Sequence, residues 1–63
     1  MRVVDTKGIV HTVRERHGKF WRYTPVPTVG ELEDECVINT VVYGPFETTD
    51  AAVNDVAVTK VIH

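Results

Sequence analysis

The alternation of apolar and polar residues predicts two β-strands near the start of the chain, over residues 9–16 (IVHTVRER) and 19–24 (KFWRYT). Both segments are rich in β-branched and aromatic residues, which pack well on a pleated surface. They are joined by His17-Gly18, and a two-residue connection that ends in glycine is typical of a β-hairpin, because the turn requires a positive φ angle. The sequence therefore predicts an antiparallel hairpin closed at these two residues.

The two-residue turn also fixes the register of this hairpin. Arg16 faces Lys19, and the pairs continue away from the turn until Thr12 faces Tyr23. Successive strand residues point to opposite faces, so the two faces differ in chemistry. The first face carries basic, aromatic and hydroxyl side chains: Thr12, Arg14, Arg16, Lys19, Trp21 and Tyr23. The second face carries Ile9, His11, Val13, Glu15, Phe20 and Arg22.

The second face of the hairpin is the one we expect to cover the core. Its apolar members Ile9, Val13 and Phe20 supply the buried surface. Arg22 does not suit such a position, so it must reach the edge of the sheet or pair with an acidic residue. The first face is then left exposed.

A loop and a third strand are predicted after the hairpin. Residues 24–35 (TPVPTVGELEDE) contain two prolines and an acidic run, which are typical of a solvated loop. Residues 36–44 (CVINTVVYG) form a strand by composition. Both alternating residue sets of this strand are largely apolar, which predicts a central strand or one that is covered on both faces.

A helix is predicted near the C-terminus. Thr48 or Thr49 is a suitable N-cap, and Asp50 in the first turn is favoured by the helix dipole. The helix then runs over residues 51 to about 58. Its sheet-facing side consists of Ala52, Val53, Val56 and Ala57.

The last residues do not fit this helix, because Val58, Val61 and Ile62 lie off its sheet-facing side and valine is a mediocre helix former. Either the helix ends early, or the tail forms a strand, or these residues contact a second chain. The predicted fold class is α+β, with a three-stranded antiparallel sheet packed on one C-terminal helix (βββα). Residues 1–63 form a single small domain, in which residues 1–8 are either a frayed N-terminus or an extra strand.

The length and the cysteine content limit the class of protein. A chain of 63 residues has a small core and a correspondingly small stability. Cys36 is the single cysteine, which excludes a disulfide within the chain and fits a reducing compartment. The first ten residues contain three charges and so resemble neither a signal peptide nor a membrane span. We therefore expect a cytoplasmic protein without membrane contacts.

Charge is distributed unevenly along the chain. Six of the seven Lys and Arg residues lie in the first 22 positions, where two acidic residues oppose them, so this segment has a net charge of +4. The remainder has one lysine and seven acidic residues, which gives −6. Such asymmetry indicates either a surface for a charged partner or two halves that attract each other in the fold.

Neither a metal centre nor a catalytic centre is predicted. The possible soft ligands have no CxxC, HxxxH or HExxH spacing: His11, His17, His63 and Cys36. Cys36 begins an apolar strand without a basic neighbour in sequence, so we expect it to be a small buried hydrophobe. The chain has no serine, its four glycines are scattered, and its acidic run lies in the predicted loop (Glu31, Glu33, Asp34 and Glu35). We therefore expect a protein that is not an enzyme and needs no cofactor.

The first face of the hairpin carries the positive evidence for a function. Guanidinium and ammonium groups bind phosphates, and arginine also pairs with guanine edges. Aromatic rings stack on bases or sugars, and a two-stranded ribbon fits the major groove of B-form DNA. Two other interpretations remain open. The face binds a protein, or it is an ordinary solvated strand face on which Arg14 packs over Trp21 as a cation–π pair.

Two short stretches resemble known DNA-binding domains: VRERHGKF at residues 13–20 and GPFETTDAA at residues 44–52. They are similar to the plant ethylene-response-factor DNA-binding domain and to the arm-site-binding N-terminal domain of phage-type tyrosine recombinases. Both families have three antiparallel strands and a helix, and both insert the sheet into the major groove. The resemblance implies that Arg14, Arg16 and Trp21 face DNA. It also implies a sheet–helix core of Phe20, Phe46, Ala52 and Val56.

The sequence thus predicts a small protein that binds double-stranded DNA through the exposed face of its hairpin, with Arg14, Arg16, Lys19, Trp21 and Tyr23 as contact residues. The resemblance implies a regulator or a recombination accessory factor of a phage or mobile element. The alternative is a small protein-interaction module of the same origin that binds a host protein or self-associates. A homodimer would form through Val58, Val61 and Ile62.

Overall fold

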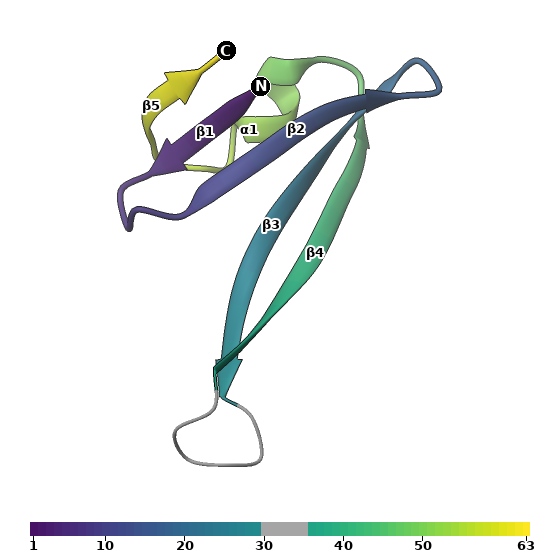
Figure 1. The fold of residues 1–63 in the computed structure, drawn as a ribbon. Helices are drawn as coiled ribbons and strands as arrows, with labels where there is room; N and C mark the ends of the chain where they lie inside the picture. Colours follow the sequence, from purple (N-terminus) through teal and green to yellow (C-terminus); the bar gives the residue numbers. More distant parts are fainter. Residues whose placement is uncertain (30–35) are drawn as a thin grey trace.

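The computed structural model describes residues 1–29 and 36–63, which form one five-stranded antiparallel sheet and one short α-helix (Figure 1). The elements in chain order are β1 (Arg2–Asp5), β2 (Val10–Arg16), β3 (Lys19–Val29), β4 (Cys36–Phe46), α1 (Thr49–Val53) and β5 (Val58–Ile62). In space the strands follow the order β4-β3-β2-β1-β5. The broad α+β class is confirmed, but the prediction of three strands and a long C-terminal helix is wrong.

The β2–β3 hairpin has the predicted register. Its cross-strand pairs run from Arg16 opposite Lys19 to Thr12 opposite Tyr23. Both turn residues have positive φ angles, 55° at His17 and 77° at Gly18. Type I′ turns require this pair of angles, and their twist matches that of the flanking strands. The assignment of side chains to the two faces of the hairpin is therefore confirmed.

Both ends of the chain form strands that add to the sheet. β1 pairs with β2, where Val3 lies opposite His11, and β5 pairs with β1, where Val3 lies opposite Val61. The side chain of Val3 is completely buried. The sequence left the structure of both ends open. Residues 1–8 contain an extra strand rather than a frayed N-terminus, and the C-terminal tail also forms a strand. β-branched residues favour this outcome, because they pack better on a sheet than in a helix.

The helix begins where the sequence predicts but ends early. Thr48 is the N-cap, and its hydroxyl accepts a hydrogen bond from the backbone N–H of Ala51 at 3.1 Å. The helix ends at Val53 rather than near Val58, so Val56 and Ala57 lie outside it. A helix of five residues is stable only through its packing, and here Ala52 is completely buried.

The helix and the sheet enclose a small core on the second face of the hairpin. Val13 and Ala52 are buried there, and Phe20 lies half-buried opposite Phe46, which is also half-buried. Val56 is half-buried as well but lies beyond the end of α1, so Ala52 is the one fully buried residue of the four that the family resemblance implies for the sheet–helix core. The first face of the hairpin lies on the opposite side of the sheet from α1.

Arg22 is buried beneath the helix, with 4% of its surface exposed. Its guanidinium donates to the backbone carbonyl of Ala52 at 3.0 Å and forms an ion pair with Asp55. It also lies over the ring of Tyr43, 4.4 Å from the centroid. The prediction that Arg22 pairs with an acidic residue is confirmed. The guanidinium thus supplies a donor to a carbonyl near the end of α1, where backbone acceptors lack helical partners.

His11 is the second buried polar residue of the core. Its Nε2 lies 2.9 Å from Oδ2 of Asp5, and its Nδ1 lies 2.9 Å from the hydroxyl of Thr24. The other carboxylate oxygen of Asp5 accepts from the backbone N–H groups of Lys7 and Ile9, both at 2.9 Å. These bonds fix the connection from β1 to β2, which holds His11 on the core-side face as predicted.

The outer part of β3 and β4 forms a two-stranded arm that extends from the body (Figure 1). We define the arm as residues 24–29 of β3 and 36–41 of β4, because the pairing of β3 with β2 ends at Tyr23. The prediction of a loop over residues 24–35 is wrong for its first six residues, and residues 30–35 lie outside the described part. Pro25 and Pro27 are two residues apart, so their backbone nitrogens point to the same side of β3. That side is the free edge of the arm, where no hydrogen bond to a neighbouring strand is lost.

Candidate nucleic-acid interface

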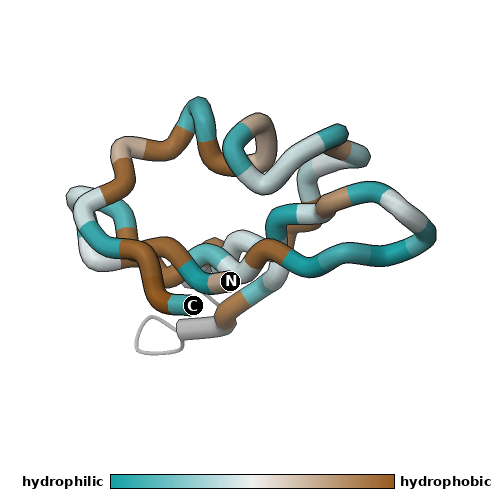
Figure 2. Tube along the Cα trace, turned by 90° about the horizontal axis from the view of Figure 1, so that it is seen from above, coloured by the Kyte–Doolittle hydropathy of each residue, from teal (hydrophilic) through white to brown (hydrophobic). Residues whose placement is uncertain are grey.

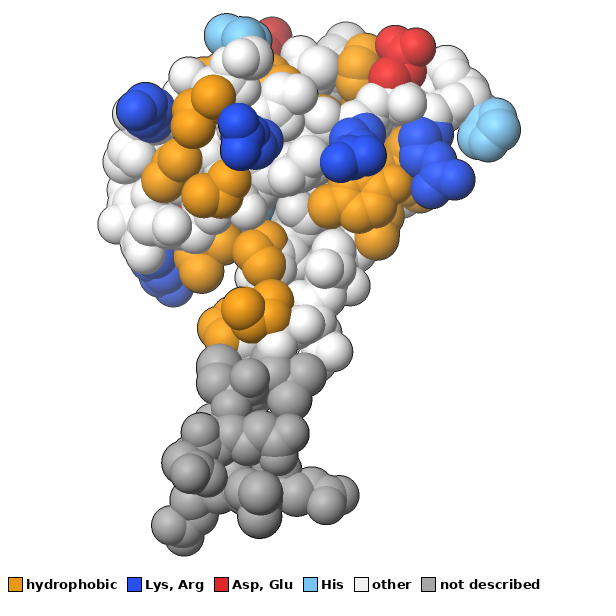
Figure 3. All heavy atoms as spheres, viewed as in Figure 1, with side chains coloured by type: hydrophobic (Ala, Val, Ile, Leu, Met, Phe, Trp, Pro, Cys, Tyr) orange, Lys and Arg blue, Asp and Glu red, His pale blue; other side chains and the backbone are white. Residues whose placement is uncertain are grey.

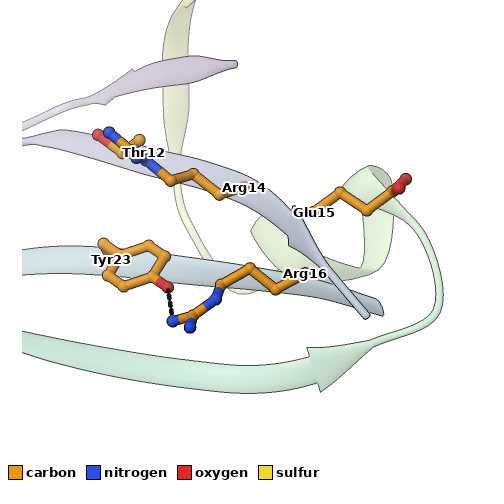
Figure 4. Close-up of a pocket in the computed structure, with 5 residues that line it drawn as sticks. All are labelled: Thr12, Arg14, Glu15, Arg16 and Tyr23. Carbon is orange, nitrogen blue, oxygen red and sulfur yellow. Dashed lines mark hydrogen bonds between the residues drawn. The ribbon is translucent and has the colours of Figure 1, made fainter. Parts of the chain in front are cut away.

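The five residues predicted to contact DNA are brought together on the open face of the β2–β3 hairpin. The register places Arg14 opposite Trp21 and Arg16 opposite Lys19, and Tyr23 follows on the same face. Figure 4 shows Arg14, Arg16 and Tyr23 around a shallow hollow, with Glu15 pointing away from Tyr23. Seen from above, the hairpin tip is a hydrophilic stretch that reaches out from the body (Figure 2).

The aromatic residues hold Arg16 in place. Its guanidinium donates to the hydroxyl of Tyr23 at 3.3 Å, and its backbone carbonyl accepts from Nε1 of Trp21 at 3.4 Å. The hydrogen bond to Tyr23 raises the pKa of the Arg16 guanidinium above its usual value, so the group stays charged. A preorganised cation loses less conformational entropy when it binds an anion, which makes Arg16 a suitable phosphate contact.

Trp21 is half-buried on the same face and packs across Gly44 of β4. An added Cβ at Gly44 would lie 2.9 Å from Cε3 of the indole. A second hollow beside the ring is lined by Arg16, His17, Trp21, Tyr23 and Val42. The indole thus forms an apolar floor next to the cations, an arrangement that suits a base or a sugar.

The two remaining cations differ in their surroundings. Lys19 forms an ion pair with Glu47, in which the two side chains keep 42% and 80% of their surface exposed. Such exposed pairs contribute about 0–1 kcal/mol, so a phosphate can replace the carboxylate. Arg14 is exposed and has no hydrogen-bond or ion-pair partner among residues 1–29 and 36–63. The cation–π pair found in these residues joins Arg22 to Tyr43, rather than Arg14 to Trp21.

The register of the sheet adds two cations that sequence reasoning missed. Arg2 lies opposite Thr12, and Lys60 lies opposite Val4, so both share the face of Arg14. We call this side of the sheet the basic face, with Arg2, Arg14, Arg16, Lys19 and Lys60 as its cations. No signal in the sequence could reveal the two additional members, because their position depends on β1 and β5 joining the sheet.

Acidic residues are scarce on the basic face. Along the described strands, alternation places Asp5 and Glu15 on the opposite face, and Asp5 is hydrogen-bonded to His11 there. Figure 3 shows basic side chains spread across this side of the body, with acidic ones at its upper margin. The uneven charge of the sequence therefore corresponds, in the described strands, to one sheet face on which the cations gather.

Other predicted sites have different outcomes. Val58 and Val61 on β5 are exposed and Ile62 is half-buried, so their role in self-association stays a prediction. The acidic run at residues 31–35 and the side chain of Cys36 lie outside the described part of the structure. Within the described part, no three His, Cys, Asp or Glu residues are grouped as a metal site.

None of the described residues belongs to a helix with the length and apolar character needed to cross a membrane. The sheet has two more strands, and the helix is shorter, than the resemblance to the ethylene-response-factor and recombinase domains implies. Comparison with known proteins finds no match for this chain among family models, curated proteins or solved structures.

Proposed function

We propose that this protein binds double-stranded DNA through its basic face, with the β2–β3 hairpin as the main contact. The observation that carries the proposal is the position of Arg14 and Arg16 beside Trp21 and Tyr23, on the side of the sheet that α1 leaves open. A two-stranded ribbon with such side chains can enter the major groove, where arginine reads guanine and binds phosphate.

The remaining residues fit supporting roles in this complex. Lys19, Arg2 and Lys60 flank the central pair of arginines and would contact phosphates on either side. Phosphate contacts position a protein on the duplex, whereas base contacts select the sequence. A role as regulator or recombination accessory factor of a phage or mobile element rests on the family resemblance alone.

A protein partner is the second candidate. The observation that favours it is the apolar hollow beside Trp21, which includes Val42 with 49% of its surface exposed. Exposed aromatic and aliphatic side chains on one patch are typical of protein interfaces. In this case the contact would rest on Trp21 and Val42 rather than on the arginines.

Salt dependence of binding distinguishes the two candidates. Fluorescence anisotropy with mixed-sequence duplexes should show tight binding at low salt and a log–log slope near −4, for about four phosphate contacts. The variant Arg14→Ala with Arg16→Ala should bind about 100-fold more weakly. Lys7→Ala is the control, because it removes an exposed cation from the β1–β2 connection. Absence of duplex binding even at low salt, with the fold intact, would overturn the proposal.

A further inference from the structure

The β4 strand forms an outer edge of the sheet that differs from its other free edges. β4 is terminal in the strand order, so its outer side has no strand neighbour within residues 1–29 and 36–63. Strand edges of this kind present unpaired N–H and C=O groups, and natural proteins usually protect them. A strand edge that lacks protective residues is therefore the best candidate for pairing with a partner strand.

The other free edges carry protective residues. On the arm, the free edge of β3 contains Pro25 and Pro27, which cannot donate to an added strand. At the opposite end of the sheet, β5 has only five residues and includes Lys60. Short length, lysine and proline are the usual means of blocking edge pairing.

β4 has none of these features along its outer edge. The strand has eleven residues and no charge, and its one proline, Pro45, lies near its end. In the β3–β4 ladder, alternation directs the backbone groups of Ile38, Thr40 and Val42 away from β3. Their side chains lie on the basic face, where Ile38 keeps 68% and Val42 keeps 49% of its surface exposed. These are the two highest values among the large hydrophobic residues of the described part.

We infer that the β4 edge binds the β4 edge of a second copy of this chain, in an antiparallel pair centred on Thr40. In this register Thr40 faces its own counterpart, and Ile38 faces Val42 of the second copy. About six hydrogen bonds would join the two strands. Apolar pairs and Thr–Thr pairs across strands are both favourable, and no charged residue opposes itself.

A second copy suits this edge better than an unrelated strand. The outward-facing positions consist of an aliphatic residue, a threonine and an aliphatic residue, so they have the same pattern in either direction. An isologous interface requires such self-complementarity. The contact also places Ile38 of each copy beside Val42 of the other, which buries part of the two most exposed aliphatic side chains of the described part.

The pairing of two copies also has a consequence for DNA binding. This consequence rests on the proposed function, whereas the pairing itself does not. Antiparallel pairing at an edge places the twofold axis perpendicular to the sheet, so both basic faces lie on the same side. With strands about 4.8 Å apart, the two β2 strands would be separated by about 24 Å across the strand direction. They would also be displaced along the strands in opposite directions, because Thr40 pairs with Pro25, beyond the end of the β2–β3 pairing. A dimer of this form would bind a DNA site with twofold symmetry.

The oligomeric state in the absence of DNA tests the inference, whatever the outcome of the DNA experiments. Sedimentation velocity over a range of concentrations should show a monomer–dimer equilibrium for the unmodified chain. Ile38→Lys and Thr40→Pro should both give monomers with unchanged circular dichroism. Val61→Lys, which alters another exposed aliphatic position, on β5, should still dimerise.

Cross-linking tests the register itself. In a Cys36→Ser background, Thr40→Cys should form an interchain disulfide on oxidation, because the two Cα atoms of a directly opposed pair lie about 5.5 Å apart. Ile38→Cys should not, since its counterpart would lie about 13 Å further along the strand. A monomer at all concentrations, or dimerisation abolished by Val61→Lys but not by Ile38→Lys, would overturn the inference.

Discussion

Arg22 on β3 and Asp55, two residues beyond the end of α1, form an ion pair that joins the sheet to the helix. The arginine is 5% exposed at its side chain, whereas the carboxylate is 64% exposed. The guanidinium is therefore the member that depends on its partners, because it has lost its hydration. The carboxylate remains largely hydrated in either state.

This asymmetry predicts that substitution at either position is costly, for different reasons. Arg22→Ala removes the contacts with Ala52 and Tyr43 and leaves a cavity, so it should destabilise the fold by about 2–4 kcal/mol. Asp55→Ala leaves the buried guanidinium without its counter-charge, so it should also cost about 2–4 kcal/mol, even though the exposed carboxylate itself loses little. Urea unfolding followed by circular dichroism measures both. Glu47→Ala, which breaks the exposed pair with Lys19, is the control and should change stability by less than about 1 kcal/mol.

Acid should weaken the fold through two aspartates. The hydrogen bond from His11 lowers the pKa of Asp5, and the hydrogen bond from Arg22 lowers the pKa of Asp55. A lowered folded-state pKa means that the unfolded chain binds protons first as the pH falls. Their contribution is thus complete above the ordinary value of 3.8 and is lost as the pH falls through the lower folded values.

Thermal unfolding between pH 7 and pH 2 measures this effect. The melting temperature should fall most steeply below about pH 4, and Asp5→Asn with Asp55→Asn should flatten that part of the curve. A curve for the double variant that runs parallel to that of the unmodified chain would show that other carboxylates cause the acid sensitivity.

Gly44 should tolerate no side chain. Its φ angle is 142°, and an added Cβ would lie 2.9 Å from the Trp21 ring and 3.0 Å from the carbonyl oxygen of Phe20. Gly44→Ala should destabilise the fold by about 2–3 kcal/mol and shift the tryptophan emission, since the indole must move. Gly8→Ala separates strain from contact, because Gly8 also has a positive φ, 81°, but has open space around it. It should cost about 1 kcal/mol without a spectral change.

The proposed DNA complex should involve the strands at both ends of the chain. Arg2→Ala and Lys60→Ala each remove a cation of the basic face that lies away from the hairpin. Each should weaken binding to all duplexes by a similar factor and reduce the magnitude of the salt slope by about 1. Anisotropy titrations at several salt concentrations measure the slope. Unchanged slopes in both variants would confine the contact to the β2–β3 hairpin.

Local signals in the sequence predicted the hairpin correctly. The turn at His17-Gly18 determines the register of β2 and β3, and the period of two then assigns Arg14, Trp21 and Tyr23 to one face. The N-cap at Thr48 follows from equally local chemistry. These features depend on residues that are close in the chain, so the sequence contains all the information needed to infer them.

Features that depend on distant segments could not be inferred in this way. Residues 58–62 form a strand because β1 offers them an open edge, and an isolated pattern of valines does not reveal that edge. The inclusion of Pro25 and Pro27 in a strand could not be inferred either, because it depends on where the pairing of β3 with β2 ends. Propensity is a weak guide where tertiary pairing decides the backbone conformation.

The sequence by itself therefore determined the hairpin, its two faces and the start of the helix, because a turn and a side-chain period are local properties. Only the tertiary structure decided the five-stranded sheet, the burial of Arg22 against Asp55 and the presence of Arg2 and Lys60 on the basic face. Each of these depends on contacts between segments far apart in the chain. Such contacts form when backbone groups and buried charges find partners, and the linear pattern does not specify which partners they find.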